Sequence, residues 1–157
     1  MKTTIDSPGV AIPPPLFYIA AFLLSLLLQK LIPITPAVFR STAFEIAGIA
    51  IVAVSLIFTI PALLQFLKTK NTIILIKPAN SLQTSGIYSR TRNPMYCGLL
   101  LLYIGLALLI GNWWTLILMP LLILVVTQKI IKPEERYLLR AFGEPYLSYK
   151  EKVRRWI

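Results

Sequence analysis

Residues 94–128 read PMYCGLLLLYIGLALLIGNWWTLILMPLLILVVTQ, a stretch without a single charged side chain. Only Gly111-Asn112 interrupts its apolar character, and this pair is a strong turn signal. Trp113 and Trp114 follow at once, as expected for side chains at a membrane–water interface. The stretch therefore predicts two membrane helices, 94–110 and 113–128, joined in a tight hairpin. One long buried helix is the alternative, which the length of the stretch and the Gly-Asn break disfavour.

The whole chain has the composition of a membrane protein. Of its 157 residues, 57% are hydrophobic and 14% are charged, and the mean hydropathy is +0.74. A soluble domain of this length could not bury so much apolar surface. The chain contains one Cys and no His. This excludes an intrachain disulfide and a His-based catalytic dyad, and we expect no metal site.

Two further apolar stretches precede the hairpin, so the sequence predicts a single all-α membrane domain with about four transmembrane helices. We expect a tail over 1–12, spans over 14–31, 45–67, 94–110 and 113–128, a polar loop over 68–93, and short cytoplasmic amphipathic helices over 129–157. A cleaved signal peptide is the alternative for the first stretch, but no small-residue cleavage site follows it. Within the loop, the β-branched run from Thr72 to Ile76 suggests an extended segment.

The net charge of +10 is distributed unevenly along the chain. With four spans, fourteen of the 16 Lys and Arg side chains fall on one side of the membrane, and only Lys30 and Arg40 fall on the other. The positive-inside rule then places both termini and the polar loop in the cytoplasm. Because the basic residues flank apolar runs, anionic lipid headgroups explain the charge better than a nucleic-acid partner does.

Two polar clusters flank the hairpin and are the candidates for chemistry. The first precedes the third span and consists of Arg90, Arg92, Asn93 and Tyr96, and the second follows the fourth span and consists of Glu134 and Glu135. Each also has a plain structural explanation: basic residues flank spans, and acids suit a helix N-terminus. Because the two helices have matched lengths, we expect Asn93 and Glu134 to meet at the same membrane face. A basic and an acidic cluster together suit a zwitterionic ligand.

Other conspicuous side chains favour structural roles. Gly98 and Gly105 lie seven residues apart on one predicted span, which favours close helix packing over contact with a cofactor. Cys97 is expected to pack as a small apolar residue. We also expect packing or interface roles for the remaining aromatic residues of interest, which are Trp113, Trp114, Trp156, Tyr137, Tyr146 and Tyr149.

Several short motifs occur in order between about residues 80 and 156. They are Gly86-Ile87-Tyr88, Arg92-Asn93-Pro94-Met95-Tyr96 with Gly98, Glu134-Glu135 with Leu138, Phe142-Gly143, and Tyr146 with Tyr149. This set resembles the integral-membrane methyltransferases of the isoprenylcysteine carboxyl methyltransferase and phospholipid methyltransferase superfamily. The resemblance implies an enzyme that uses S-adenosyl-L-methionine without a soluble Rossmann domain, and the chain indeed lacks a G-x-G-x-x-G segment.

By position, the resemblance also implies site residues. The implied cofactor-binding residues are Asn80, Ser81, Leu82, Gln83, Tyr88, Asn93, Pro94, Met95, Tyr96, Glu134 and Glu135. The implied catalytic residues are Arg92, Asn93 and Glu134, with Arg92 as the candidate partner of the cofactor carboxylate.

The chain departs from the prenylcysteine enzymes of that superfamily at two positions. They carry His where this chain has Asn93, and an Arg where it has Ile130. The second position is associated with substrate in those enzymes, so the departure weakens the case for a prenylcysteine acceptor. A lipid amine, a thiol or a carboxylate stays possible as the lipophilic acceptor. The alternative functions are a non-catalytic membrane scaffold or assembly factor and, less favoured because the spans carry no buried charge, a small transporter.

Overall fold

The expected all-α class is confirmed in the computed structural model, which describes residues 9–10, 12–34, 41–69 and 79–156. These residues contain no β-strand. The helices are α1 (Pro14–Leu31), α2 (Thr42–Lys68), α3 (Pro94–Ile110), α4 (Trp113–Val126), α5 (Lys132–Phe142) and α6 (Glu144–Lys152), with a 3-10 turn at Gly86–Ser89. The extended segment expected at Thr72–Ile76 lies outside the described residues.

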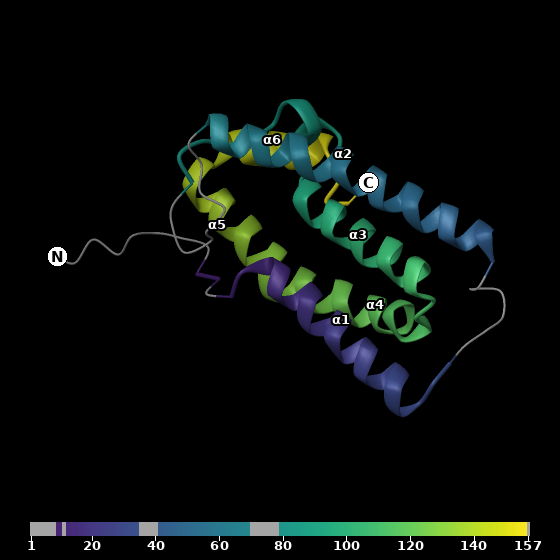
Figure 1. The fold of residues 1–157 in the computed structure, drawn as a ribbon. Coiled ribbons are helices and arrows are strands. Elements are labelled where there is room, and N and C mark those ends of the chain that lie inside the picture. Colours follow the sequence, from purple (N-terminus) through teal and green to yellow (C-terminus); the bar gives the residue numbers. More distant parts are fainter. Residues whose placement is uncertain (1–8, 11, 35–40, 70–78, 157) are drawn as a thin grey trace.

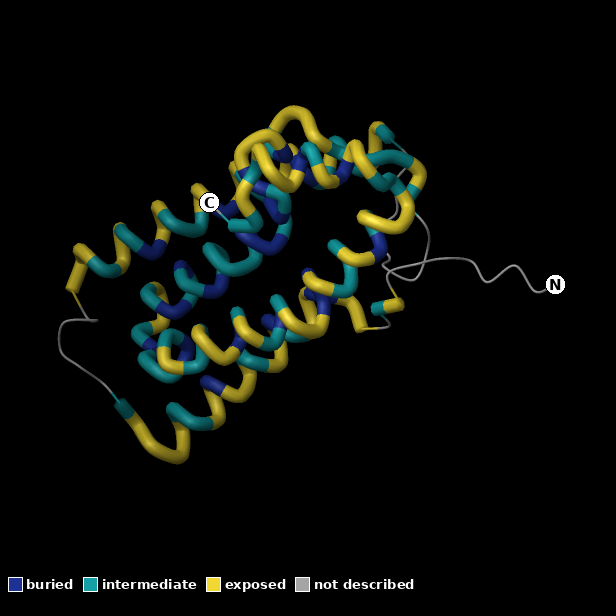
Figure 2. Tube along the Cα trace, turned by 180° about the vertical axis from the view of Figure 1, so that it is seen from behind, coloured by how far each residue is buried: buried dark blue, intermediate teal, exposed yellow. Residues whose placement is uncertain are grey.

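Helix α3 lies at the centre of the bundle (Figure 1). It packs against α2 on one side and against α4 and α1 on the other, while α1 runs along α4. Figure 2 shows that the outward faces of these helices are exposed and that their buried residues face inward. Large apolar side chains such as Ile57, which is 62% exposed, cover these outward faces. Such faces belong in lipid rather than in water.

Three of the described helices are long and apolar enough to cross a membrane. They are Pro14–Leu31, Thr42–Lys68 and the continuous helix Trp113–Phe142. Helix α3 is equally apolar but has only 17 residues, slightly fewer than the ~20 that usually span a bilayer. The chain is therefore an all-α membrane protein, and the number of four spans stays a prediction.

The predicted hairpin is confirmed at Gly111-Asn112. Gly111 adopts a left-handed conformation (φ 64°), which glycine reaches without strain, and ends α3. The side chain of Asn112 then begins α4 by accepting a hydrogen bond from the backbone N–H of Trp114 at 3.0 Å. Gly111 and Asn112 thus reverse the direction of the chain within two residues. They form the tip of the hairpin, from which α3 and α4 run antiparallel.

A buried polar contact attaches α1 to this tip. The amide of Asn112 donates to the hydroxyl of Ser25 at 3.1 Å, and the Ser25 hydroxyl lies 2.8 Å from that of Thr115. All three residues are almost fully buried. Because buried polar groups cannot bond to water, these side chains must satisfy one another. The contact therefore fixes the register of α1 against the hairpin.

Glycines let α2 and α3 approach each other closely, as the sequence predicts for Gly98 and Gly105. A Cβ atom on Gly105 would lie 3.0 Å from the carbonyl oxygen of Gly48 and 2.7 Å from a methyl group of Val52. A Cβ atom on Gly98 would overlap the hydroxyl of Thr59. Small residues at such crossings bring helix backbones together in membranes. Helix α2 is thus held mainly by its fit against α3.

The start of α5 differs from the prediction. The sequence suggests a new helix at Pro133, with Glu134 and Glu135 near its free N-terminus. Instead, the helix runs from Trp113 to Phe142 through a π turn at Thr127–Ile131, in which the N–H of Lys132 bonds to the carbonyl of Thr127. Pro133 has no N–H to donate, and the wide turn just before it allows the helix to continue. The two glutamates therefore sit on a continuous helix that begins at the hairpin tip.

We predict that Gly105→Val destabilises the protein by about 1–3 kcal/mol, because the larger side chain forces α2 and α3 apart. Thermal unfolding of the detergent-purified protein measures the effect as a lower midpoint temperature. Ala50→Val is the matched control, since Ala50 is exposed on α2, and it should leave the midpoint nearly unchanged. Equal midpoints for the two variants would contradict the close approach of these helices.

Candidate functional site

A cavity of about 90 Å³ lies where the ends of several helices meet the polar loop. Its walls come from the start of α1, the end of α2, the 3-10 turn, the start of α3 and α5. The lining residues are Pro14, Pro15, Phe66, Tyr88, Arg92, Asn93, Pro94, Met95, Tyr96, Leu99 and Glu134.

Members of both polar clusters predicted from the sequence meet in this cavity, although Arg90 and Glu135 do not line it. Tyr88, Arg92, Asn93, Pro94, Met95, Tyr96 and Glu134 all belong to the expected site and all line the cavity. The convergence of Asn93 with Glu134 follows from the hairpin, since the two helices return to the same end of the bundle. The structure thus builds one wall from the loop and the start of α3, and the opposite wall from α5.

The cavity also uses residues that sequence reasoning missed. Phe66 comes from α2 and Pro14 and Pro15 from α1, segments that the sequence reveals only as generic apolar helices. Leu99 could have been predicted from the sequence. It follows Tyr96 by three residues and Met95 by four, and therefore lies on the same face of the helix. The ring of Phe66 stacks on that of Tyr88, with the ring centres 5.8 Å apart. These residues give the cavity an apolar side.

Glu134 is the acidic group of the cavity. The Tyr96 hydroxyl donates to its carboxylate at 2.8 Å, which joins α5 to the start of α3. Glu134 lies beyond the uncharged stretch that ends at Gln128, and so outside the predicted span over 113–128. Burial, and to a smaller extent the neighbouring charge of Glu135, raise the pKa of Glu134 to about 7, although the hydrogen bond from Tyr96 acts in the opposite direction. The carboxyl group therefore titrates near neutral pH.

Two buried polar atoms in the cavity wall have no hydrogen-bond partner among the residues that the structure describes. They are the hydroxyl of Tyr88 and the Nε of Arg92. Buried polar groups in proteins nearly always find a partner, so unpartnered ones call for an explanation. With the carboxylate of Glu134 they supply two donors and one anionic acceptor around a single space. This combination suits a ligand that carries both a positive and a negative group.

The rest of the Arg92 guanidinium is held in place. One terminal nitrogen donates to the Tyr146 hydroxyl at 3.4 Å, and the other lies 3.3 Å from the carboxylate of Glu135. Glu135 does not line the cavity, although the resemblance implied that it binds cofactor. Instead it forms two hydrogen bonds with Arg155, at 2.8 and 2.7 Å. Glu135 therefore lies behind Arg92, on the far side from the cavity.

Arginine charges control the ionisation of Glu135. Partial burial pushes its pKa upward, but the hydrogen bonds from Arg155 and the charge of Arg92 outweigh burial and hold the pKa below its ordinary value. The neighbouring glutamates thus differ in charge near pH 6, where Glu135 is ionised and Glu134 is largely protonated. Different surroundings on one helix produce this contrast.

The C-terminal segment fixes the loop before α3. The N–H of Arg92 donates to the carbonyl of Arg154 at 2.9 Å, and the side-chain amide of Asn93 donates to the carbonyl of Arg155 at 2.9 Å. The Thr91 hydroxyl donates to the same carbonyl at 3.1 Å. Asn93 therefore borders the cavity while its amide is used to hold the backbone. No local sequence signal indicated this role of residues 154 and 155.

Loop residues 80–83 are expected in the cofactor pocket but are not among the residues that line the cavity. Gln83 accepts a hydrogen bond from Gln65 at 3.0 Å and donates to Ser81 at 2.8 Å. Asn80 and Leu82 belong to the same segment. Just before it, the N–H of Ala79 donates to the Tyr137 hydroxyl at 2.7 Å. The segment is thus anchored to α2 and α5 next to the cavity, and its contact with a ligand stays a prediction.

The three tyrosines near the C-terminus pack, as the sequence suggests, and each also holds a neighbouring group. Tyr137, Tyr146 and Tyr149 are all buried. The hydroxyl of Tyr149 donates to the carbonyl of Tyr88 at 2.7 Å, which fixes the 3-10 turn. Within the described part of the chain, no three His, Cys, Asp or Glu side chains gather into a group that could hold a metal ion.

Part of the chain is similar in sequence to known methyltransferases. Protein-S-isoprenylcysteine O-methyltransferase of Schizosaccharomyces pombe is 36% identical over 72 residues, which is 46% of this chain and 30% of that protein. The Saccharomyces cerevisiae protein of the same name is 35% identical over 69 residues, which is 44% of this chain and 29% of that protein. The matches thus span less than a third of these relatives.

An uncharacterized protein of Haemophilus influenzae is 43% identical over 63 residues, which is 40% of this chain and all of that protein. No solved structure matches the chain significantly. The model of the phospholipid methyltransferase family matches residues 44–145, well over half of the chain and most of the cavity wall. The chain therefore belongs to the phospholipid methyltransferase family.

Proposed function

We propose that this chain is a membrane-embedded methyltransferase that moves a methyl group from S-adenosylmethionine to a lipophilic acceptor. The observation that carries the proposal is the cavity in which Glu134, Arg92 and Tyr88 surround one space at the end of the hairpin. Family membership and the names of the curated relatives support the same reaction class. We further propose that the site faces the cytoplasm, because the basic residues gather at that end of the predicted spans.

The polar groups of the cavity fit the amino-acid and sulfonium part of this cofactor. Glu134 can accept from an ammonium group or face a sulfonium charge, and the unpartnered Nε of Arg92 can donate to a carboxylate. The unpartnered hydroxyl of Tyr88 supplies a further donor or acceptor. Pockets that hold whole drug-sized molecules measure about 300–1,000 Å³. The cavity of about 90 Å³ therefore suits this part of the molecule rather than all of it.

Bound S-adenosylmethionine supplies an electrophilic methyl group on a positively charged sulfur. Transfer to a nucleophile is an in-line displacement, so the protein must chiefly align the partners and exclude water. Glu134 and Arg92 bind and orient charged groups, and Tyr96 holds the Glu134 carboxylate in position. Phe66, Pro94 and Leu99 keep water away from the other side of the cavity. No general base is required, which is compatible with a chain that lacks His.

The apolar side of the cavity suits a lipophilic acceptor. Pro14 and Pro15 at the start of α1 and Phe66 near the end of α2 border it. These helix ends lie where the apolar spans give way to polar segments, at the level of lipid headgroups. We propose that the reactive group of the acceptor enters here while its hydrocarbon part stays in the membrane.

We predict that S-adenosylmethionine binds the purified protein more tightly as pH rises from about 6 to 8. The reason is that Glu134, with a pKa of about 7, becomes ionised in this range and attracts the cationic groups. Binding to Glu134→Gln should be weaker by roughly tenfold at pH 8, as expected for the loss of a charge-assisted contact, and nearly independent of pH. Isothermal titration calorimetry in detergent measures both effects.

Glu144→Gln is the matched control, because it removes an exposed carboxylate from the neighbouring helix. It should bind S-adenosylmethionine as the unmodified protein does, with the same pH dependence. The proposed role of Glu134 is wrong if Glu134→Gln retains both the affinity and the pH dependence.

We also predict methyl transfer to a lipid. The purified protein, supplied with methyl-labelled S-adenosylmethionine and a total membrane-lipid extract, should produce a labelled lipid-soluble product, and Glu134→Gln should produce far less. Mass spectrometry of this product identifies whether nitrogen, oxygen or sulfur is methylated. Cofactor binding without any labelled product would favour the non-catalytic scaffold instead.

A further inference from the structure

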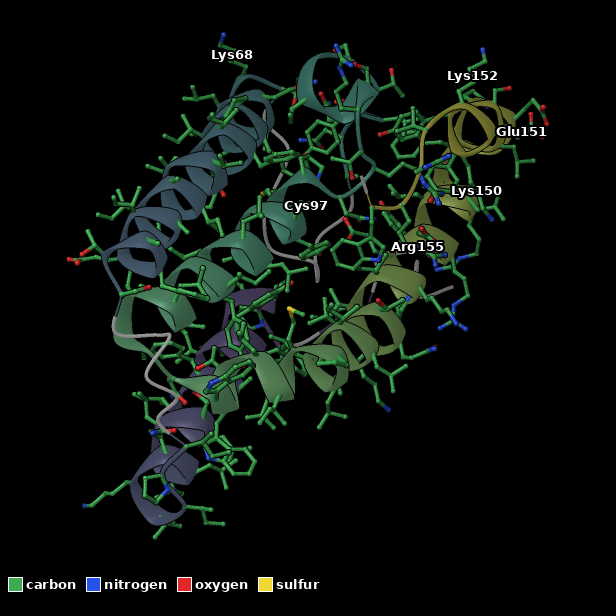
Figure 3. The ribbon with its side chains drawn as sticks, turned by 90° about the vertical axis from the view of Figure 1, so that its right-hand side faces the viewer. Lys68, Cys97, Lys150, Glu151, Lys152 and Arg155 are labelled. Carbon is green, nitrogen blue, oxygen red and sulfur yellow. The ribbon has the colours of Figure 1, made fainter. Side chains whose placement is uncertain are left out.

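A second hollow in the protein lies between α5 and α6 and has a different character. It measures about 470 Å³ and is lined by Lys132 and Arg136 from α5, Tyr146 and Lys150 from α6, and Arg155 from the C-terminal segment. Figure 3 shows Lys150 and Arg155 close together on this side of the molecule. The hollow shares no lining residue with the cavity that Glu134 borders. We call it the basic groove.

Positive charge in the basic groove exceeds negative charge. Four cationic side chains line it together with a single carboxylate, that of Glu135. This carboxylate is already bound by Arg155 at 2.7 Å and by Arg92 at 3.3 Å. Lys132 and Arg136 are exposed and form no ion pair with any residue that the structure describes. The groove therefore holds unneutralised cations that can meet an anion.

Elements on three sides build the groove, so it is more than a run of surface lysines. Lys132 and Arg136 lie one helical turn apart on the same face of α5. Glu135 fixes the guanidinium of Arg155 between the helices through two hydrogen bonds. The Tyr146 hydroxyl is buried beside it and also contacts Arg92. An anion in the groove would thus meet the exposed ammonium groups of Lys132 and Lys150 and the guanidinium of Arg155, which Glu135 holds in place.

The groove adjoins the end of the predicted fourth span. Gln128, which also lines it, is the last residue of the uncharged stretch, and Lys132 follows one turn later. The apolar side chain of Leu139 borders the groove and is 38% exposed. Basic residues just outside a span meet the phosphate groups of anionic lipids. A ligand here encounters cations on one side and exposed apolar surface on the other, as a phospholipid does at its headgroup.

We propose that the basic groove binds the phosphate group of an anionic membrane phospholipid, at a site separate from the cavity for methyl transfer. Lys132, Arg136 and Lys150 supply the charge, and Arg155 supplies further hydrogen-bond donors. The exposed side chain of Leu139 and the position next to the end of the span favour a lipid over free phosphate. The proposal does not depend on methyl transfer, because binding can be measured without cofactor or acceptor.

Native mass spectrometry of the full chain in detergent tests this proposal. Dioleoyl phosphatidylglycerol should bind about tenfold more tightly than dioleoyl phosphatidylcholine, because it carries a net negative charge. In the variant K132Q/R136Q/K150Q this preference should fall to about twofold or less. The control K30Q/K68Q/K152Q removes the same charge from exposed residues outside the groove, and it should retain the preference.

Three results would overturn the proposal. The first is an unmodified protein that binds the two lipids equally, a test that requires no variant to fold. The second is an equal loss of preference in both triple variants, which would mean that diffuse charge rather than the groove attracts lipid. The third is competition by inorganic phosphate at the same concentrations as phosphatidylglycerol, which would make the groove a site for free phosphate.

Discussion

The hydrogen bond between Tyr96 and Glu134 is the contact on which the candidate site depends. It joins the start of α3 to the far end of the helix that leaves the hairpin tip. Asn112 fixes the hairpin at the tip, and Tyr96 and Glu134 close it at the open end. Between these two points the helices have little freedom to slide. The cavity is therefore a product of the hairpin as a whole rather than of the loop that covers it.

A row of three charged side chains connects the two hollows of the protein. Arg92 borders the cavity, Glu135 lies behind it, and Arg155 reaches the basic groove. The ion pairs between them measure 3.3 and 2.7 Å. These ion pairs link the C-terminal segment to the guanidinium that borders the cavity.

The sequence predicted the fold best where a short local motif determines the path of the chain. Gly111-Asn112 favoured a reversal of the chain over one long helix, and the reversal brought Asn93 and Glu134 together. The π turn at Thr127–Ile131 could not be read in this way, because it depends on packing and shifts the face on which later residues point. For that reason the sequence could not show that Glu134 lines the cavity and Glu135 does not. The contributions of Phe66 and Arg155 depend on tertiary contacts that no local pattern encodes.

The short length of α3 has a consequence for the surrounding bilayer. Seventeen residues of helix extend about 26 Å, whereas the hydrocarbon core is about 30 Å thick. A span that is too short is accommodated by local thinning of the membrane. Because α1, α2 and α4 pack around α3, little of this helix meets lipid directly, and the thinning would affect the bilayer around the bundle. In a membrane thinned in this way, lipid headgroups would lie closer to the cavity wall that the start of α3 forms.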